Sequence, residues 1–248
     1  MIRFKNNNSK TTILFLHGLA CDSTYFSDML LLLGKDYNFV LPELFGHYEK
    51  SKNTFTLEEE SDLIIDFCKI NNTKIDYVVA HSMSSILAFI VDSKVDTIKK
   101  IFLLEGNIIP EDFKWSSQLA EMNNIEFKHY WEKFQKQYPL ILKMTLKKRI
   151  DLKKYTENIK LLNGIGIHHY ANLITVYENK MQEFTTSFRK VKYLESESSK
   201  FLQKKEKLFQ NDNLKLHVVS NASHYLMLDN PNSVIEILKE EILCPLVQ

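Results

Sequence analysis

Residues 78–85 read Val-Val-Ala-His-Ser-Met-Ser-Ser, and here a strand-like pattern gives way to a helical one. Apolar residues that favour a buried strand end at Ala80, and after Ser84 apolar side chains recur at the spacing of an amphipathic helix. Ser82 therefore lies on a sharp turn between a strand and a helix. Such a turn strains the backbone and admits only small side chains two positions before and after the serine, where this chain has Ala80 and Ser84. The turn holds the Ser82 hydroxyl clear of the sheet and close to the N–H groups of the helix, which favours a nucleophile.

Short apolar segments alternate with longer helical patterns in most of the chain, as in β-α units that form a parallel sheet. We predict strands at residues 13–16, 39–41, 77–80, 101–104, 191–194 and 216–219. A capping box that begins at Thr56 predicts the start of one helix, and Asn230-Pro231 predicts the start of the last one. The sequence therefore indicates an α/β fold with a mostly parallel sheet flanked by helices.

Residues 111–188 break this alternation. They contain helical patterns rich in aromatic residues and no convincing strand, and they are too long for an ordinary crossover, which takes one helix. We therefore expect a core formed by residues 1–110 and 189–248, with a helical cap inserted at 111–188 between two strands. A set of ordinary packing helices is the alternative.

Several segments together resemble the α/β-hydrolase superfamily, in its serine-nucleophile branch with a helical cap. The family's turn around the nucleophile reads Gly-x-Ser-x-Gly, and this chain has Ala-x-Ser-x-Ser around Ser82. Residues 13–19 (Ile-Leu-Phe-Leu-His-Gly-Leu) are similar to the family's strand and His-Gly turn. By this resemblance, the backbone N–H groups of Leu19 and Met83 would form the oxyanion hole, and His17 would support the loop. Residues 41–47 resemble a loop that shapes the site, with Glu43 in place of the family's Asp.

The candidate base is His224. Residues 218–231 contain the parts of the family's closing motif in order: a strand, a short loop of small residues, a histidine, an apolar turn and a helix that starts with a proline. Histidine suits this role because its ordinary pKa lies near neutral pH. The pair His168-His169 has no carboxylate at ligand spacing, so we expect it to pack in the cap or contact substrate, with no metal site.

The acid of a Ser–His–acid triad is harder to assign. Most of the family takes it from the loop after the strand that follows the cap, but residues 193–199 (Tyr-Leu-Glu-Ser-Glu-Ser-Ser) have no Asp. A known variant places a Glu at the end of the strand before the cap, and Glu105 lies there. A carboxylate that closes an apolar strand needs a partner, because its desolvation is costly. We therefore choose Glu105, with Glu197 as the alternative.

Composition limits the remaining possibilities. The 248 residues carry 32 Lys and Arg and 31 Asp and Glu, and this balance argues against a general nucleic-acid binder. The three cysteines (Cys21, Cys68 and Cys244) have no metal-site spacing, which favours a reduced, cytoplasmic setting. No apolar run has the ~20 residues of a membrane helix, and the first residues resemble no signal peptide, so we expect no membrane insertion.

The sequence thus predicts an enzyme, a carboxylic ester hydrolase that needs no cofactor. Ser82 would attack a small ester-like acyl substrate and form an acyl-enzyme that water hydrolyses, with His224 as the base and Glu105 as the acid. Ester, thioester, lactone and activated C–C substrates all remain open, as does the oligomeric state. The alternative is a non-catalytic receptor or interaction module with the same fold.

Overall fold

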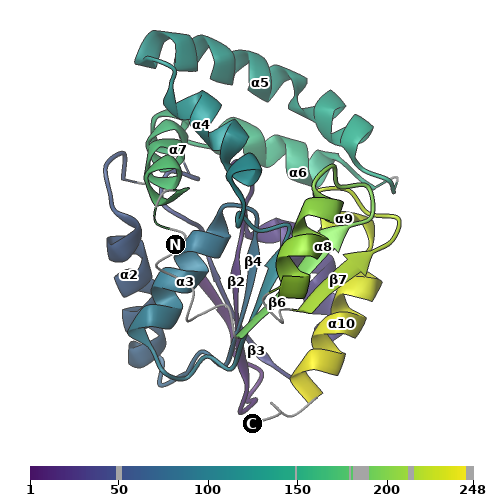
Figure 1. Ribbon diagram of the computed structural model, residues 1–248. Coiled ribbons are helices and arrows are strands. Elements are labelled where there is room, and N and C mark those ends of the chain that lie inside the picture. The colour runs from purple at the N-terminus through teal and green to yellow at the C-terminus, as the bar shows by residue number, and fades with distance from the viewer. Residues whose placement is uncertain (49–51, 149, 179, 181–189, 212–214, 244–248) are drawn as a thin grey trace.

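A seven-stranded sheet forms the centre of the molecule in the computed structural model (Figure 1). The structure describes all residues except 49–51, 149, 179, 181–189, 212–214 and 244–248. The strands are β1 (Ile2–Lys5), β2 (Thr12–Leu16), β3 (Asn38–Pro42), β4 (Tyr77–His81), β5 (Lys100–Leu104), β6 (Val191–Ser196) and β7 (Lys215–Val219). Their order in the sheet is β1-β3-β2-β4-β5-β6-β7, and every neighbouring pair is parallel except β1 with β3.

The six predicted strands correspond to β2–β7, which confirms the expected parallel α/β sheet. The antiparallel edge strand β1 was not among the predicted strands. Its burial alternates residue by residue, with Ile2 and Phe4 packed against the core and Arg3 and Lys5 exposed. An edge strand with one exposed face does not show the continuous apolar run on which the other strands were recognised.

The helices of the core cover both sides of this sheet. They are α1 (Ser27–Leu33), α2 (Leu57–Ile70), α3 (Ser84–Lys94), α8 (Leu202–Asn211), α9 (Leu226–Asp229) and α10 (Pro231–Leu243). Figure 1 shows α2 and α3 on one side and α10 on the other. The predicted capping box is present, since the Thr56 side chain accepts from the Glu59 N–H and the Glu59 carboxylate accepts from the Thr56 N–H. Asn230 caps α10 by accepting from the Ser233 N–H at 3.2 Å.

Helix α3 differs from the prediction. We expected an amphipathic helix after Ser84, but every side chain from Ser84 to Asp92 is buried, Leu87 and Val91 included. The helix packs against β2 and β4 of the sheet and against α2, and its side chains are covered on all sides. An all-round apolar surface is typical of such an enclosed helix.

Between β5 and β6 the described chain is helical. It forms a short 3-10 turn (Pro110–Phe113), α4 (Lys114–Ala120), α5 (Asn124–Thr145), α6 (Lys153–Asn158), a second 3-10 turn (Ile159–Leu161) and α7 (Gly164–Glu178). Figure 1 shows these helices above the upper ends of the strands. Residues 181–188, the end of the predicted cap, lie outside the described part of the chain. Among the helices that are described, none combines the length and the apolar composition that a membrane crossing needs.

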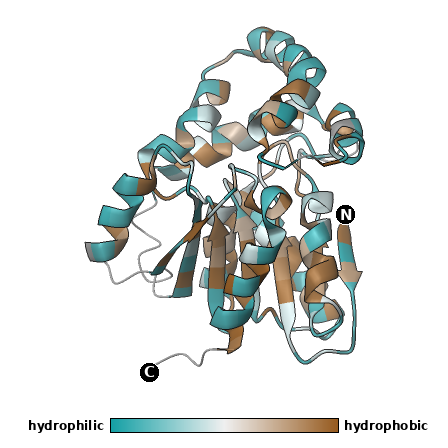
Figure 2. Ribbon diagram, turned by 90° about the vertical axis from the view of Figure 1, so that its right-hand side faces the viewer, coloured by the Kyte–Doolittle hydropathy of each residue, from teal (hydrophilic) through white to brown (hydrophobic). Residues whose placement is uncertain are grey.

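The hydrophobic core runs through the sheet into this helical layer. Figure 2 shows hydrophobic residues concentrated in the strands, with hydrophilic residues on the outer helix surfaces. Cys21 and Cys68 are buried free thiols, and Cys244 lies outside the described residues. The core therefore supports the strand ends from below while the helices between β5 and β6 cover them from above.

The burial of α3 leads to a stability prediction. Leu87→Ala should lower the free energy of unfolding by about 2–5 kcal/mol, because a fully buried leucine leaves a cavity when truncated. The same change at Leu63 on α2, where 46% of the residue is exposed, should cost much less. Chemical denaturation of both variants measures the difference. Equal losses would contradict the enclosed position of α3.

Candidate active site

Ser82 lies on a strained turn where β4 meets α3. Its φ is +54°, a backbone angle that residues other than glycine rarely adopt. The Ser82 N–H donates to the Leu104 carbonyl at 3.0 Å, which fixes the turn to the end of β5. Space around the turn is tight: a Cβ added to Gly18 would lie 2.5 Å from His81 Nδ1 and 3.4 Å from Ser82 Cβ. Gly18 is therefore needed for the close approach of its loop to the turn.

Glu105 and His224 are in direct contact. His224 Nδ1 lies 2.8 Å from Glu105 Oε2, and the Ser196 N–H donates to Glu105 Oε1 at 3.0 Å. Glu105 follows β5 directly and has a φ of +46°, so the chain turns sharply here as it does at Ser82. The His224 side chain is 42% exposed, whereas that of Glu105 is 11% exposed. The carboxylate is thus mostly buried, and the imidazole is the more exposed of the two at the cavity.

Electrostatics favour an ionised Glu105 beside His224. Burial acts to raise the pKa of Glu105, but the hydrogen bond and charge of His224 and the Ser196 N–H together lower it. Burial acts to lower the pKa of His224, but the hydrogen bond and charge of Glu105 raise it above its ordinary value. The pair can therefore take up a proton on the imidazole and stabilise the resulting cation.

The alternative acid, Glu197, points elsewhere. It is exposed, and its Oε1 accepts a hydrogen bond from the Asn221 N–H at 2.7 Å. Glu195, two residues earlier, is fully buried and is ion-paired with Lys205 at 3.1 Å. Of the three carboxylates, only Glu105 contacts the His224 ring.

The two predicted oxyanion donors flank the turn at Ser82. Leu19 and Met83 border the same cavity as Ser82 and His224. Among the described residues, neither backbone N–H donates a hydrogen bond to the protein. Ala20, which follows Leu19, has a φ of +59°, so this loop is also turned sharply beside the site. Both residues therefore border the cavity, and neither N–H has a protein partner in the described structure.

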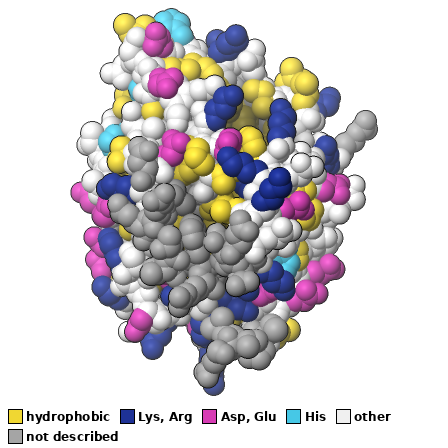
Figure 3. Space-filling model, viewed as in Figure 1, with side chains coloured by type: hydrophobic (Ala, Val, Ile, Leu, Met, Phe, Trp, Pro, Cys, Tyr) yellow, Lys and Arg dark blue, Asp and Glu magenta, His cyan; other side chains and the backbone are white. Residues whose placement is uncertain are grey.

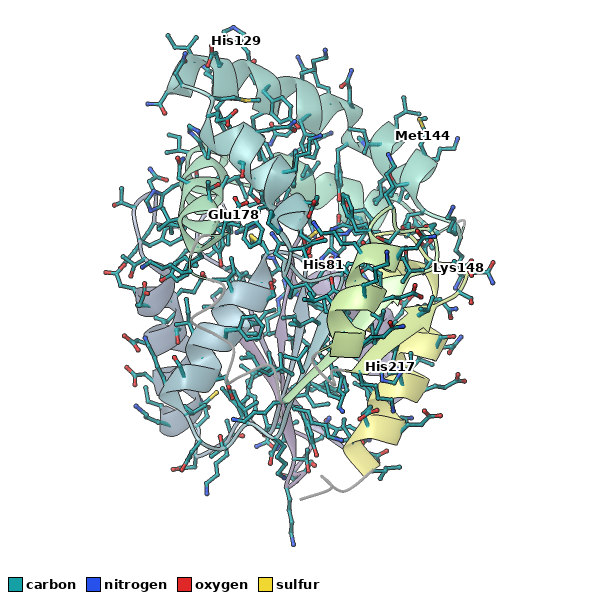
Figure 4. The ribbon with its side chains drawn as sticks, in the orientation of Figure 1. His81, His129, Met144, Lys148, Glu178 and His217 are labelled. Carbon is teal, nitrogen blue, oxygen red and sulfur yellow. The ribbon has the colours of Figure 1, made fainter. Side chains whose placement is uncertain are left out.

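Two residues that hold the histidine loop were missed in the sequence analysis. His81 Nε2 lies 3.0 Å from the His224 carbonyl oxygen, and Figure 4 shows His81 at the upper end of the strands. Burial and the neighbouring His224 lower the pKa of His81 to about 3, so the ring is neutral and its Nε2–H donates to that carbonyl. The Asp229 carboxylate accepts from the Ser223 N–H at 2.8 Å and from the Lys147 N–H at 2.7 Å. It therefore joins the histidine loop to the chain that follows α5.

A cavity of about 640 Å³ opens beside these groups. Ser82, Glu105 and His224 border it together with apolar side chains such as Trp115 and Phe201. On the face shown in Figure 3, hydrophobic side chains lie among Lys and Arg side chains below the upper helices. The volume is that of a small-molecule site.

The other residues singled out in the sequence are held in packing and hydrogen-bonding contacts away from Ser82 and His224. The buried His17 accepts from the Leu44 N–H at 3.1 Å, as expected of a residue that supports its loop. Glu43 is also buried. It accepts a hydrogen bond from the Ser23 N–H and forms an ion pair with Arg3. His168 stacks on Phe127 with ring centroids 4.3 Å apart, and His169 bonds to the backbone of Phe55. Within the described ranges, no group of three or more His, Cys, Asp or Glu side chains could hold a metal ion.

Among the comparisons with known proteins, the one with solved structures supports the architecture described above. No family model matches the sequence, and no curated protein matches it either. Solved structures do match. A carboxylesterase from the thaumarchaeon Nitrososphaera gargenis is 14% identical, with a TM-score of 0.69 over 98% of this chain and 93% of that one.

Two further structures are similar over most of their length. A thermophilic esterase from Thermogutta terrifontis is 16% identical, with a TM-score of 0.71 over 97% of this chain and 92% of that one. A hydrolase from Oleispira antarctica is 14% identical, with a TM-score of 0.71 over 98% and 94%. The strand order, the helices on both sides of the sheet and these matches together show that the chain has the α/β-hydrolase fold.

Proposed function

We propose that the protein is a serine hydrolase that cleaves a small carboxylic ester through an acyl-enzyme. Ser82 Oγ attacks the carbonyl carbon while His224 Nε2 takes its proton. The carbonyl oxygen becomes an oxyanion that accepts from the N–H groups of Leu19 and Met83. The proton on Nε2 then passes to the leaving alcohol, and the ester C–O bond breaks. Water, activated by the same imidazole, hydrolyses the acyl-enzyme and frees Ser82.

The observation that carries this proposal is the 2.8 Å contact between His224 Nδ1 and Glu105 Oε2 at the cavity that Ser82 borders. A carboxylate on Nδ1 keeps the proton on that nitrogen and leaves Nε2 free as a base. The positive φ of Ser82 adds support, because a strained turn persists only where the surrounding structure enforces it. The esterases and hydrolases among the similar structures agree with this chemistry.

The substrate in this proposal is small and partly apolar. Trp115 and Phe201 provide apolar and aromatic surface in the cavity, suited to the acyl or alcohol group of an ester. We further propose that the helices α4–α7 act as a cap that determines which substrates fit. A non-catalytic receptor with the same cavity would bind such a molecule without cleaving it, and the first experiment below separates the two.

Ser82→Ala should abolish hydrolysis of p-nitrophenyl acetate and butyrate, leaving only the rate of a control without protein. Ser93→Ala, the same change on an exposed residue in the last turn of α3, should keep wild-type turnover. The measurement is steady-state release of p-nitrophenolate with a check for an initial burst. Equal rates in wild type and Ser82→Ala would favour the receptor.

The identity of the acid can be tested with one substitution at two positions. Glu105→Gln should lower kcat by roughly 10³–10⁴-fold, because the amide cannot hold the imidazole in the required tautomer or stabilise its cation. Glu197→Gln should leave kcat within about threefold of wild type, since its carboxylate accepts from a backbone amide of the outer loop and, within the described residues, makes no contact with His224. A larger loss at Glu197 would transfer the role of acid to that residue.

The pH profile provides a further test of the Glu105–His224 pair. His224 must be neutral to accept a proton, and its pKa is raised above the ordinary value of about 6.5. As the pH is lowered, kcat/KM should therefore begin to decrease before pH 6.5 is reached. Glu105→Gln removes the charge that stabilises the imidazolium, so the acid limb of its residual activity should move to lower pH. An acid limb at the same pH in both proteins would show that Glu105 does not act on His224.

A further inference from the structure

Lys205 on α8 is a buried cation in the wall of the same cavity. Only 1% of the residue is exposed. Its ammonium group lies 2.9 Å from Asp112 Oδ1, 3.1 Å from Glu195 Oε2 and 2.7 Å from the Tyr193 hydroxyl oxygen. Burial of three charges is costly, and it is sustained only where each charge has close partners. The mechanism proposed above does not use any of these groups.

The partners of Lys205 hold the chain that follows Glu105. Tyr193 accepts from Lys205 and donates its own hydrogen to the Gly106 carbonyl at 2.6 Å. Asp112 Oδ2 accepts from the Ile108 N–H at 3.0 Å and from the Ile109 N–H at 3.1 Å. The segment just after Glu105 is therefore fixed at three backbone positions by groups that meet at Lys205.

A second connection reaches Glu105 from β6. Glu195 precedes Ser196, whose N–H donates to Glu105 Oε1. Burial and the charge of Glu105 raise the pKa of Glu195, so the two carboxylates are near enough to repel each other. Lys205 offsets this repulsion by binding Glu195 directly. Without the ammonium group, the buried carboxylates of Asp112 and Glu195 would lose the cation that pairs with both of them.

From this geometry we infer that Lys205 is a positioning residue for the acid of the proposed hydrolase. Lys205 holds Glu105 at its distance from His224 and keeps Glu195 from competing for the imidazole. The inference rests on the proposed function, since it assigns Lys205 a role in that reaction. Lys205 itself contacts neither His224 nor Ser82 among the described interactions.

Lys205→Met removes the charge and keeps a side chain of similar length. We expect kcat for p-nitrophenyl butyrate to fall about 10- to 100-fold with KM nearly unchanged, the effect of a small displacement of the acid. The matched control is Lys100→Met. Lys100 is also buried and ion-paired, with Glu241 at 3.3 Å, but it lies at the opposite end of the strand that precedes Glu105. This control should lower the melting temperature without a comparable loss of kcat.

A double variant tests the charge argument. Lys205→Met with Glu195→Gln removes one cation and one carboxylate, so it should recover part of the kcat lost in Lys205→Met. Glu195→Gln alone should stay within a few-fold of wild type, because Lys205 keeps Asp112 as its partner. No recovery in the double variant, or equal kcat in Lys205→Met and Lys100→Met, would overturn the inference.

A spectroscopic measurement separates failure of this inference from failure of the proposed function. The Nδ1–H proton of His224 should give a low-field NMR signal, because it is shared with the Glu105 carboxylate, and His224→Gln identifies it by its loss. The signal should be retained in Lys100→Met and lost or shifted upfield in Lys205→Met. An unchanged signal in Lys205→Met contradicts positioning by Lys205. Absence of Ser82-dependent hydrolysis in the wild type contradicts only the proposed reaction.

Discussion

The parallel register of the central strands is the constraint on which the rest of the site depends. His81 pairs with Leu104, and Leu104 pairs with Leu194, so β4, β5 and β6 approach the same edge in step. Hydrogen bonds extend this register beyond the pairing: Ser82 N donates to Leu104 O at 3.0 Å, and Glu105 N donates to Leu194 O at 2.9 Å. Ser82 and Glu105 are far apart in sequence and neighbours in space because the sheet leaves them at one level.

The backbone at this edge is strained where the chain leaves the sheet. Ala20, Ser82, Glu105 and Asn221 all have positive φ, and each lies in a loop that carries or supports a candidate site residue. Strain of this kind typically costs roughly 1–3 kcal/mol per residue. Close packing maintains it, as at Gly18 against His81, and so do bonds such as that from His81 to the histidine loop. The sharp turns allow short side chains to stand out from the sheet into the cavity.

The local patterns of the sequence were sufficient to predict the parallel strands and the helix caps at Thr56 and Asn230. Each depends on residues close together in the chain. The contact of Glu105 with His224 was predictable only as a choice between two carboxylates, because the relevant partners lie on other elements. Lys205 gave no signal in the sequence, because it is one of several lysines in a Lys-rich segment (residues 204–207) of the kind that usually forms a solvated helix face. Its burial follows from the packing of α8 against β6 and the turn that contains Asp112.

The partners of the carboxylates, more than their positions in the sequence, determine which one can serve the imidazole. Glu197 is turned outward to the Asn221 amide, while Glu195 and Asp112 share the Lys205 ammonium group. Glu105 has one oxygen on the Ser196 amide, and its other oxygen is left for His224. Glu195, near the end of β6, is therefore a carboxylate close to the site that is already paired with a cation. In the proposed reaction, Glu105 at the end of β5 can act as the acid because Lys205 binds the neighbouring negative charge of Glu195.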